Sequence, residues 1–373
     1  YEIGVRLVGS EMCIRDREIN KGCIMKNKLK HLVPVLLALA TITGSLSACE
    51  LKPKAQQKVS KQGFYFDTII QITLYGTTDE KYIDDCFDMA KKYEDMLSNT
   101  VSYSEVSKIN DAAGKEYVTV SDDTLELIKN GIEYGDTSDG RFDITIGKLS
   151  DLWNFSEIAE NTDSKDNEVD ASVVPSDAQI QSELSHVNYR NIQINGNDVM
   201  LTDSKAKLDL GGIAKGFIAD KMKAYLQSKK ITSGIINLGG NVLTVGEKSD
   251  GSDYTVGIQK PFDESGEPIC TVKIKDKSVV TSGIYERYYR VDGKLYHHIL
   301  DTTTGYPVKN NLYSVTIISD SSCDGDALST TCFALGIDKA KELINSLSGV
   351  EAIFVTDDYS IITTSDEYNV SKE

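Results

Sequence analysis

The sequence predicts an α+β fold in which mixed sheets pack against helices. Amphipathic stretches with helical spacing and short runs of β-branched and aromatic residues follow one another irregularly, without the strand–helix–strand rhythm of a doubly wound sheet. The chain has 373 residues, of which 40% are hydrophobic and 26% are charged. This balance allows a large hydrophobic core and excludes global disorder.

The first half of the chain predicts three helices and a hairpin. Residues 63–75 alternate in polarity like a single strand, and residues 80–97 place apolar side chains at helical spacing. A polar loop is expected at 98–110, a second amphipathic helix at 122–134, and a surface loop in the acidic stretch 156–184. An Asn-Gly pair predicts a hairpin over 191–201, a strand follows at 207–210, and a helix is expected over 213–228.

The second half predicts mainly strands. Short β-rich runs lie at 234–238, 241–245, 254–258, 271–274, 278–281, 313–319, 352–356 and 361–364, and a hairpin is expected from 287–291 and 295–300. Helices are expected at 326–335 and 338–347, separated by Gly336. These elements complete one large domain over residues 62–373.

The N-terminal region predicts export and lipidation. Residues 25–48 combine a lysine-rich start, the apolar run 32–42 and small residues that end at Ala48, which is the pattern of a secretory signal. Because Cys49 follows directly, the junction resembles a bacterial lipobox; the plainer alternative is ordinary cleavage with a chance cysteine. We expect an acylated Cys49, a tether over 49–61 and a protein held on the extracytoplasmic face of the cell membrane. Residues 1–24 fit no role and are expected to be a gene-model artefact.

The charge balance argues against nucleic acid as a partner. Lys and Arg total 40 against 57 Asp and Glu, so the formal net charge is -17. A nucleic-acid binder needs a basic face, whereas this chain would repel phosphates. Any phosphate-bearing ligand therefore needs a local remedy such as a metal ion or a helix N-terminus.

Three segments could carry chemistry. Leu208 to Gly216 form a glycine turn that leads into a helix, where Lys215 could meet a phosphate or could simply face solvent. His297 and His298 leave a predicted strand on opposite faces, so at most one lines a given pocket, and either could be an ordinary buried histidine. Asp326 and Thr330 share one face of a predicted helix, where they suit Mg²⁺, although capping by Asp324 or Asp326 is the commoner meaning.

The order of the motifs resembles the ApbE family, the FAD:protein FMN transferases, over about residues 63–364. The motifs are Phe66-Asp67-Thr68, Ser104-Glu105-Val106-Ser107, Phe142-Asp143-Ile144-Thr145, Asp209-Leu210-Gly211-Gly212, Asn237-Leu238-Gly239-Gly240, His298-Ile299-Leu300-Asp301 and Asp326-Ala327-Leu328-Ser329-Thr330. The resemblance implies a T-fold-related single domain that acts on FAD with Mg²⁺.

The resemblance also implies roles for individual residues. A threonine hydroxyl of a partner flavoprotein, in an exported or membrane electron-transfer system, would attack the FMN-side phosphorus of FAD and release AMP. His298 would be the catalytic base, and Gly212, Asp326 and Thr330 would bind the metal. The implied FAD contacts are Phe66, Tyr103, Ser104, Asp143, Lys215, Leu300 and Asp301.

Two alternatives to the transferase stay open from the sequence. The same site could pass the phosphoryl group to water as an FAD pyrophosphatase, or the chain could be a flavin-binding lipoprotein without chemistry. The sequence also departs from the family pattern at two places. Phe66 stands where many relatives have Met, and Thr303 stands where many have Arg after the histidine.

Overall fold

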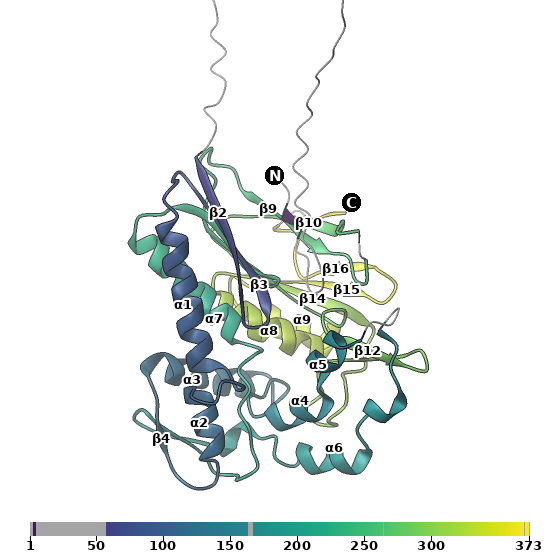
Figure 1. Ribbon diagram of the computed structural model, residues 1–373. Helices are drawn as coiled ribbons and strands as arrows, with labels where there is room; N and C mark the ends of the chain where they lie inside the picture. Colours follow the sequence, from purple (N-terminus) through teal and green to yellow (C-terminus); the bar gives the residue numbers. More distant parts are fainter. Residues whose placement is uncertain (1–2, 5–56, 163–166, 264, 369, 373) are drawn as a thin grey trace, which may run out of the picture. The chain divides into compact units, whose positions relative to one another are not determined.

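An eight-stranded sheet organises the fold in the computed structural model, which describes residues 3–4, 57–162, 167–263, 265–368 and 370–372 (Figure 1). Every pairing in this sheet is antiparallel. In spatial order its strands are β16 (Ile361–Thr363), β15 (Glu351–Thr356), β14 (Leu312–Ser319), β11 (Ser278–Gly283), β8 (Asn241–Gly246), β7 (Ser233–Leu238), β3 (Thr68–Tyr75) and β2 (Lys58–Tyr65).

Three smaller sheets and nine α-helices surround the main sheet in the described part of the chain. The smaller sheets contain β1 (Ile3–Gly4), β9 (Tyr254–Gln259), β10 (Pro268–Ile274) and β17 (Ser371–Lys372); β12 (Tyr288–Val291) and β13 (Lys294–His297); and β4 (Val118–Thr119), β6 (Asp198–Leu201) and β5 (Ile192–Asn195). The helices are α1 (Lys81–Leu97), α2 (Glu105–Asp111), α3 (Asp122–Thr137), α4 (Gly147–Trp153), α5 (Phe155–Glu160), α6 (Asp177–Leu184), α7 (Ala214–Ser228), α8 (Ser322–Leu335) and α9 (Ile337–Ser346). None of the described helices is long and apolar enough to cross a membrane.

The main sheet is covered on both faces because its central strands are apolar on both sides. On β7, Ile236 packs into the cluster that contains α1 and α7, whereas its neighbour Ile235 packs with β9 and β10. Successive strand residues point to opposite faces, so this split marks two layers of core. Figure 1 shows α1, α7 and α8 along the helical side of the sheet.

The contact between α7 and α8 depends on a glycine. A Cβ atom at Gly216 would lie 2.1 Å from the carbonyl oxygen of Ser322 and 2.7 Å from the Cα of Cys323. In addition, the Asp220 carboxylate on α7 accepts hydrogen bonds from the backbone N–H groups of Ser322 and Cys323, each at 2.9 Å. The first turn of α8 is therefore held by a side chain of α7.

The α+β prediction is confirmed, and most predicted elements lie where they were expected. The apolar positions predicted for the first helix are all buried in α1, and the helix predicted at 213–228 corresponds to α7. The sheets contain less parallel pairing than the mixed sheets that were predicted. Between described strands, only β1 and β9 pair in parallel.

Several local predictions are wrong. The single strand predicted at 63–75 is a hairpin, because Phe66 and Asp67 both take φ of 54° and reverse the chain without an Asn-Gly signal. The predicted tether to residue 61 overlaps β2, which begins at Lys58. The loop expected at 98–110 contains α2, and the described part of 156–184 contains α5 and α6.

Two further boundaries differ in the second half of the chain. Helix α8 begins at Ser322 rather than Asp326, with Ser321 as its N-cap, so Asp326 lies in the second turn and does not cap the helix. Strand β13 ends at His297 rather than at residue 300, and residues 207–210 form only a bridge from Lys207 to Ile146. The signal and lipidation predictions for residues 1–48 and Cys49 lie outside the described residues, apart from the short strand β1.

We expect the α7–α8 contact to be sensitive to a single methyl group. Gly216→Ala should lower the free energy of unfolding by about 3 kcal/mol, because the added Cβ meets backbone atoms that have little room to move. Urea unfolding measures this change, with Gln227→Ala on the exposed side of α7 as the control. Equal stabilities for the two variants would contradict the tight contact.

Candidate active site

Four segments meet at one end of the main sheet. Helix α7 runs back to β7, so the N-terminus of α7 lies at the end where β7 turns into β8 through Gly239 and Gly240. The β2–β3 turn lies at the same end, because Ile70 pairs with Leu238 and Thr68 packs against Gly239. Strand β11 runs toward this end past its pairing of Val280 with Asn241, so the segment after Gly283 also reaches it.

Asp326 connects α8 with the start of α7. Its side chain is buried, and Oδ2 accepts a hydrogen bond of 2.9 Å from the backbone N–H of Gly216. Oδ1 lies 3.9 Å from Nζ of Lys215, which is longer than a hydrogen bond, and makes none with the described residues. Because one oxygen holds α7 in place, the other remains available to a ligand.

Thr330 follows Asp326 by one helical turn within α8, and residues at this spacing lie on the same side of a helix. The Oγ1 atom of Thr330 lies 3.1 Å from Oγ of Ser282 on β11, which also bonds to Ser329 at 2.7 Å. Gly212 lies two residues before α7, and the nearest side chain to its ideal Cβ is Phe142 at 3.2 Å.

These residues fit a hard cation, although the protein supplies few charged ligands. The donors are one carboxylate oxygen, one hydroxyl and a main-chain carbonyl, which is the oxygen chemistry that Mg²⁺ prefers. Within the described residues no group of three or more His, Cys, Asp or Glu side chains could hold a metal. A cation here would therefore complete its shell with water and with oxygens of its ligand.

Lys215 supplies positive charge at the start of α7. Its ammonium group donates to the carbonyl oxygen of Gly211 at 3.2 Å, so the side chain folds back over the glycine turn. Of the two alternatives that the sequence left open for Lys215, simple exposure to solvent is disfavoured, because the side chain is only 23% exposed. The helix start and the ammonium group together favour an anionic ligand.

The two histidines have different environments, as their alternation predicts. His297 is 5% exposed; its Nε2 lies 3.0 Å from the carbonyl oxygen of Val308, and its Nδ1 accepts from the N–H of Ile299. Both ring nitrogens are thus used within the protein. Burial lowers the pKa of His297 from 6.5 to about 4, so the ring is neutral near pH 7.

His298 is half-buried, and Nε2 of its ring makes no hydrogen bond within the described residues. Nδ1 lies 3.3 Å from the carbonyl oxygen of Arg287, so it carries the proton and leaves Nε2 as a base. Burial, and next the positive charge of Arg287, hold the pKa of His298 well below its ordinary value. The positive charge of Lys215 also lowers the pKa of His298, so the ring lies within electrostatic range of the start of α7.

The predicted FAD contacts near the N-terminus meet at the last turn of α1. The N–H of Phe66 donates to the carboxylate of Glu94 at 2.8 Å, and the Tyr103 hydroxyl donates to Asp95 at 2.8 Å. Tyr103 is 61% exposed, so its ring is available to a ligand or partner. Ser104 is buried, caps α2 by accepting from Ser107, and donates to Ser98, so its hydroxyl is already used.

The remaining predicted contacts have structural partners. The Asp143 carboxylate accepts hydrogen bonds from Thr145 and from the backbone of Tyr189, and burial raises its pKa despite these bonds. Leu300 is buried and forms a bridge with Pro307. Asp301 accepts from Arg141 Nη1 at 3.0 Å, which joins the segment after His298 to the segment before Asp143.

Arg141 and Glu286 are residues that the sequence analysis missed. Arg141 also donates to the Thr303 hydroxyl at 3.3 Å, so a basic group from another segment meets the position where a basic residue was expected. Glu286 follows β11 and lies in electrostatic range of Lys215 and Asp326. Its signal in the sequence was an acidic residue directly before the predicted hairpin that begins at Arg287.

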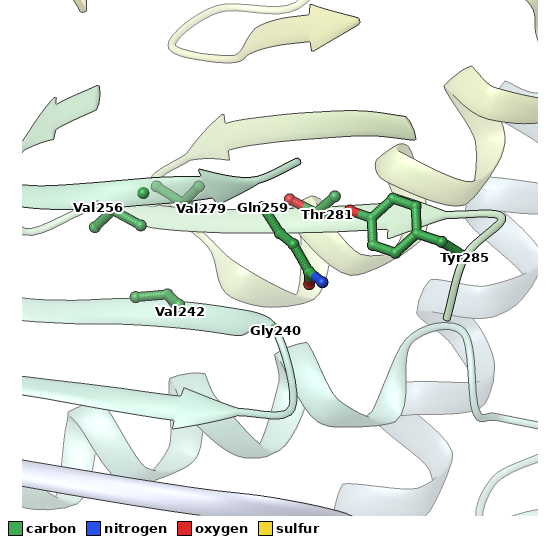
Figure 2. A pocket seen from close by; sticks show the side chains of 8 residues that line it. Gly240, Val242, Val256, Gln259, Val279, Thr281 and Tyr285 are labelled. Atoms are coloured by element: carbon green, nitrogen blue, oxygen red, sulfur yellow. The ribbon is translucent and has the colours of Figure 1, made fainter. Parts of the chain in front are cut away.

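A narrow pocket lies on the face of the sheet that packs against β9, and it is lined in part by Gly240 of the β7–β8 turn and by Tyr285, which precedes Glu286. Figure 2 shows Gln259 and Tyr285 pointing into it, between Val242 of β8, Val256 of β9 and Thr281 of β11. Its free space is about 10 Å³, room for about one water molecule, so it cannot hold a nucleotide. The buried Oε1 of Gln259 makes no hydrogen bond within the described residues, and a water molecule would satisfy it.

The fold and the order of these residues along the chain are those of a family of transferases. A model described as the ApbE family matches residues 66–354, and the chain belongs to this family. A protein of Klebsiella pneumoniae (strain 342) named FAD:protein FMN transferase is 38% identical over 298 residues, which cover 79% of this chain and 88% of that protein. A second one, from Treponema pallidum (strain Nichols), is 31% identical over 291 residues, with coverage of 74% and 77%.

Solved structures agree with this assignment. The crystal structure of the ApbE protein from Thermotoga maritima is similar with a TM-score of 0.73 and 30% identity, covering 82% of this chain and 96% of that chain. The flavin transferase ApbE from Vibrio cholerae gives a TM-score of 0.71 and 26% identity, with coverage of 83% and 96%. The family predicted from the motifs is therefore confirmed.

We expect His297 to make the protein sensitive to acid. Because folding lowers its pKa, its contribution to stability is complete above pH 6.5 and is lost as the pH falls toward 4, on the order of 3 kcal/mol in total. The free energy of unfolding is measured from pH 7 to 4 for the wild type and for His297→Gln. Over this range that of the wild type should fall by about 3 kcal/mol more than that of the variant. Parallel curves would mean that the ring does not have to stay neutral.

Proposed function

We propose that this chain transfers FMN from FAD to a hydroxyl group of a partner flavoprotein and releases AMP. The observation that carries the proposal is the neutral His298 with a free Nε2, in electrostatic range of the helix start that holds Lys215. Family membership and the relatives named FAD:protein FMN transferase support it.

The diphosphate of FAD would bind at the start of α7. Ile213 provides no side-chain cap, and in the first turn of α7 only the N–H of Lys215 makes no hydrogen bond within the described residues, because Ala214 donates to Leu210 at 2.9 Å and Gly216 donates to Asp326. This N–H group and the helix dipole are available to an anion. Lys215 adds a compact positive charge next to them. This local positive charge would allow an anionic diphosphate to bind to a chain whose formal net charge of -17 otherwise repels it.

A divalent cation, Mg²⁺ by this proposal, would be held by Asp326 Oδ1, Thr330 Oγ1 and the carbonyl oxygen of Gly212. When bound, it would withdraw charge from the phosphate oxygens and from the departing AMP. The contribution of the chain is to fix these oxygens in place, since Asp326 is anchored through Oδ2 and Thr330 through Ser282.

His298 would act as the general base. A threonine hydroxyl of the acceptor would give its proton to Nε2 while its oxygen bonds to the FMN-side phosphorus. The bond from that phosphorus to the bridging oxygen breaks, and AMP leaves with the electron pair. The hydrogen bond from Nδ1 to Arg287 keeps the ring in the required tautomer.

The flavin and its ribityl chain would extend toward the loops around the site. Phe66, Tyr103 and Ser104 lie together at the end of α1, and Asp143 and Asp301 are joined through Arg141. The side chains of Ser104 and Asp143 already have internal partners, so we expect them to shape the site through the backbone that they hold.

We further propose that the protein is lipid-anchored through Cys49 on the extracytoplasmic face of the cell membrane. The support is the order of a basic segment, an apolar run and small residues before Cys49. An anchored enzyme would act on flavoproteins of exported or membrane electron-transfer systems.

We expect the transferase to label its acceptor covalently. The full chain, FAD and Mg²⁺ are incubated with candidate exported flavoproteins, and flavin fluorescence is measured in denaturing gels. A fluorescent acceptor band with equimolar AMP would support transfer. Rapid AMP release without a labelled acceptor would indicate a pyrophosphatase, and intact FAD would indicate a binding protein.

We expect His298→Asn to lower the single-turnover rate of FMN transfer by roughly 100- to 10,000-fold, because the attacking hydroxyl loses its base. FAD affinity should change little, since a neutral ring acts mainly in the transition state. The matched variant His297→Asn should keep nearly the full rate, because both of its ring nitrogens bond within the protein. An equal or larger loss for His297→Asn would overturn the assignment.

We expect Cys49→Ser to release the protein from membranes. Two acyl chains anchor stably, whereas a hydroxyl group at this position cannot accept the thioether-linked lipid. Partitioning of the wild type and the variant in a detergent phase separation measures the difference. If both enter the aqueous phase after expression in a bacterium that processes lipoproteins, the anchor proposal fails.

A further inference from the structure

Glu286 has a buried carboxylate oxygen that finds no hydrogen-bond partner among the described residues. The residue follows β11 and precedes β12, and its backbone N–H donates to the carbonyl oxygen of Gly283 at 3.3 Å. Its Oε1 is inaccessible to solvent and makes no hydrogen bond within the described residues. A buried carboxylate oxygen without a donor is costly, so such groups call for a functional or structural explanation.

Charges from three segments surround Glu286. Lys215 at the start of α7 and the adjacent Arg287 attract its carboxylate, and Asp326 on α8 repels it. Neither Lys215 nor Arg287 forms an ion pair with it, so both act at longer range than direct contact. Burial, with repulsion from Asp326 adding to it, raises the pKa of Glu286 to about 7.

Glu286 and Asp326 have a common deficiency. Each has one carboxylate oxygen without a hydrogen bond from the described residues. Their segments meet, because Ser282 at the end of β11, four residues before Glu286, lies 3.1 Å from Thr330 on α8, and the two carboxylates repel each other. A divalent cation would satisfy both oxygens and turn their repulsion into attraction. A neutral hydroxyl of a ligand would satisfy one oxygen and leave the repulsion unchanged.

We propose that Glu286 is a further residue of the cation site, presenting Oε1 to the divalent cation that Asp326 binds, directly or through a water molecule of its shell. The inference rests on the proposed function only in its use of Asp326 as a cation ligand. It adds a second carboxylate, from the β11–β12 connection, to a site otherwise built from the turn before α7 and from α8.

The stability of the metal-free protein depends on which role Glu286 has. Since the Glu286 oxygen lacks a partner until a cation binds, replacing the carboxylate should not reduce the stability of the metal-free protein. A carboxylate retained for structural reasons would behave in the opposite way. Stability and metal affinity therefore separate the two roles without any measurement of activity.

The test measures binding of Mn²⁺ alone, by electron paramagnetic resonance, to the full chain and its variants. Glu286→Gln should raise the dissociation constant at least tenfold, and so should Asp326→Asn, which keeps an oxygen that can accept from Gly216. Glu342→Gln, an exposed position on α9, is the matched control and should not change it. The metal-free unfolding midpoint of Glu286→Gln should equal or exceed that of the wild type, and its rise on adding Mn²⁺ should be smaller.

The outcomes distinguish this inference from the proposed function. If Asp326→Asn loses Mn²⁺ and Glu286→Gln binds it like the wild type, the Glu286 assignment is wrong and the Asp326 site stands. If neither variant changes the affinity, the cation placement in the proposed function fails as well. If Glu286→Gln does not fold, the charge-retaining Glu286→Asp replaces it in the test. The inference then stands only if Glu286→Asp folds and binds Mn²⁺ at least tenfold more weakly than the wild type; any other result indicates a structural role.

Discussion

The site depends on a reciprocal arrangement in which α7 and α8 each satisfy the other's first turn. Asp326 of α8 accepts the N–H of Gly216, the third residue of α7, while Asp220 of α7 accepts the first two N–H groups of α8. Helix starts have free N–H groups, and here the buried Asp326 and the half-buried Asp220 supply the missing acceptors. The helices can approach closely enough only because residue 216 is a glycine.

This arrangement explains how one carboxylate can have both a structural and a chemical role. Asp326 uses Oδ2 to fix its own orientation and leaves Oδ1 toward the site. Two positive groups, Lys215 and Arg287, lie in electrostatic range of His298 and favour the neutral ring that a base requires. The same charges prepare a strongly acidic protein to accept an anionic ligand.

The sequence was informative where function requires particular residue types in a fixed order. The turn before α7, the neighbouring histidines and the Asp326–Thr330 spacing could all be located, because their residue types follow one another in the order of the family's motifs. The helical period also places Asp326 and Thr330 one turn apart on α8. The hairpin turn at Phe66 and Asp67 could not be predicted, since both residues take a left-handed conformation without glycine or asparagine. Glu286 was missed because its environment comes from α7 and α8, which are distant in sequence, and Arg141 because Asp301 is 160 residues away.

If the protein is anchored through Cys49 as proposed, the position of strand β2 limits how far the active-site end of the sheet can lie from the membrane. The strand begins at Lys58, so eight residues separate it from Cys49 and can span at most about 29 Å when fully extended. The strand itself has eight residues, about 26 Å, and its far end is the turn at Phe66, on the side of the sheet where the active-site segments meet. The catalytic end would thus face away from the strand's point of attachment, within a layer about 55 Å deep at the membrane surface. Acceptors would have to expose their hydroxyl groups inside that layer, which favours membrane-bound or surface-attached flavoproteins over freely diffusing ones.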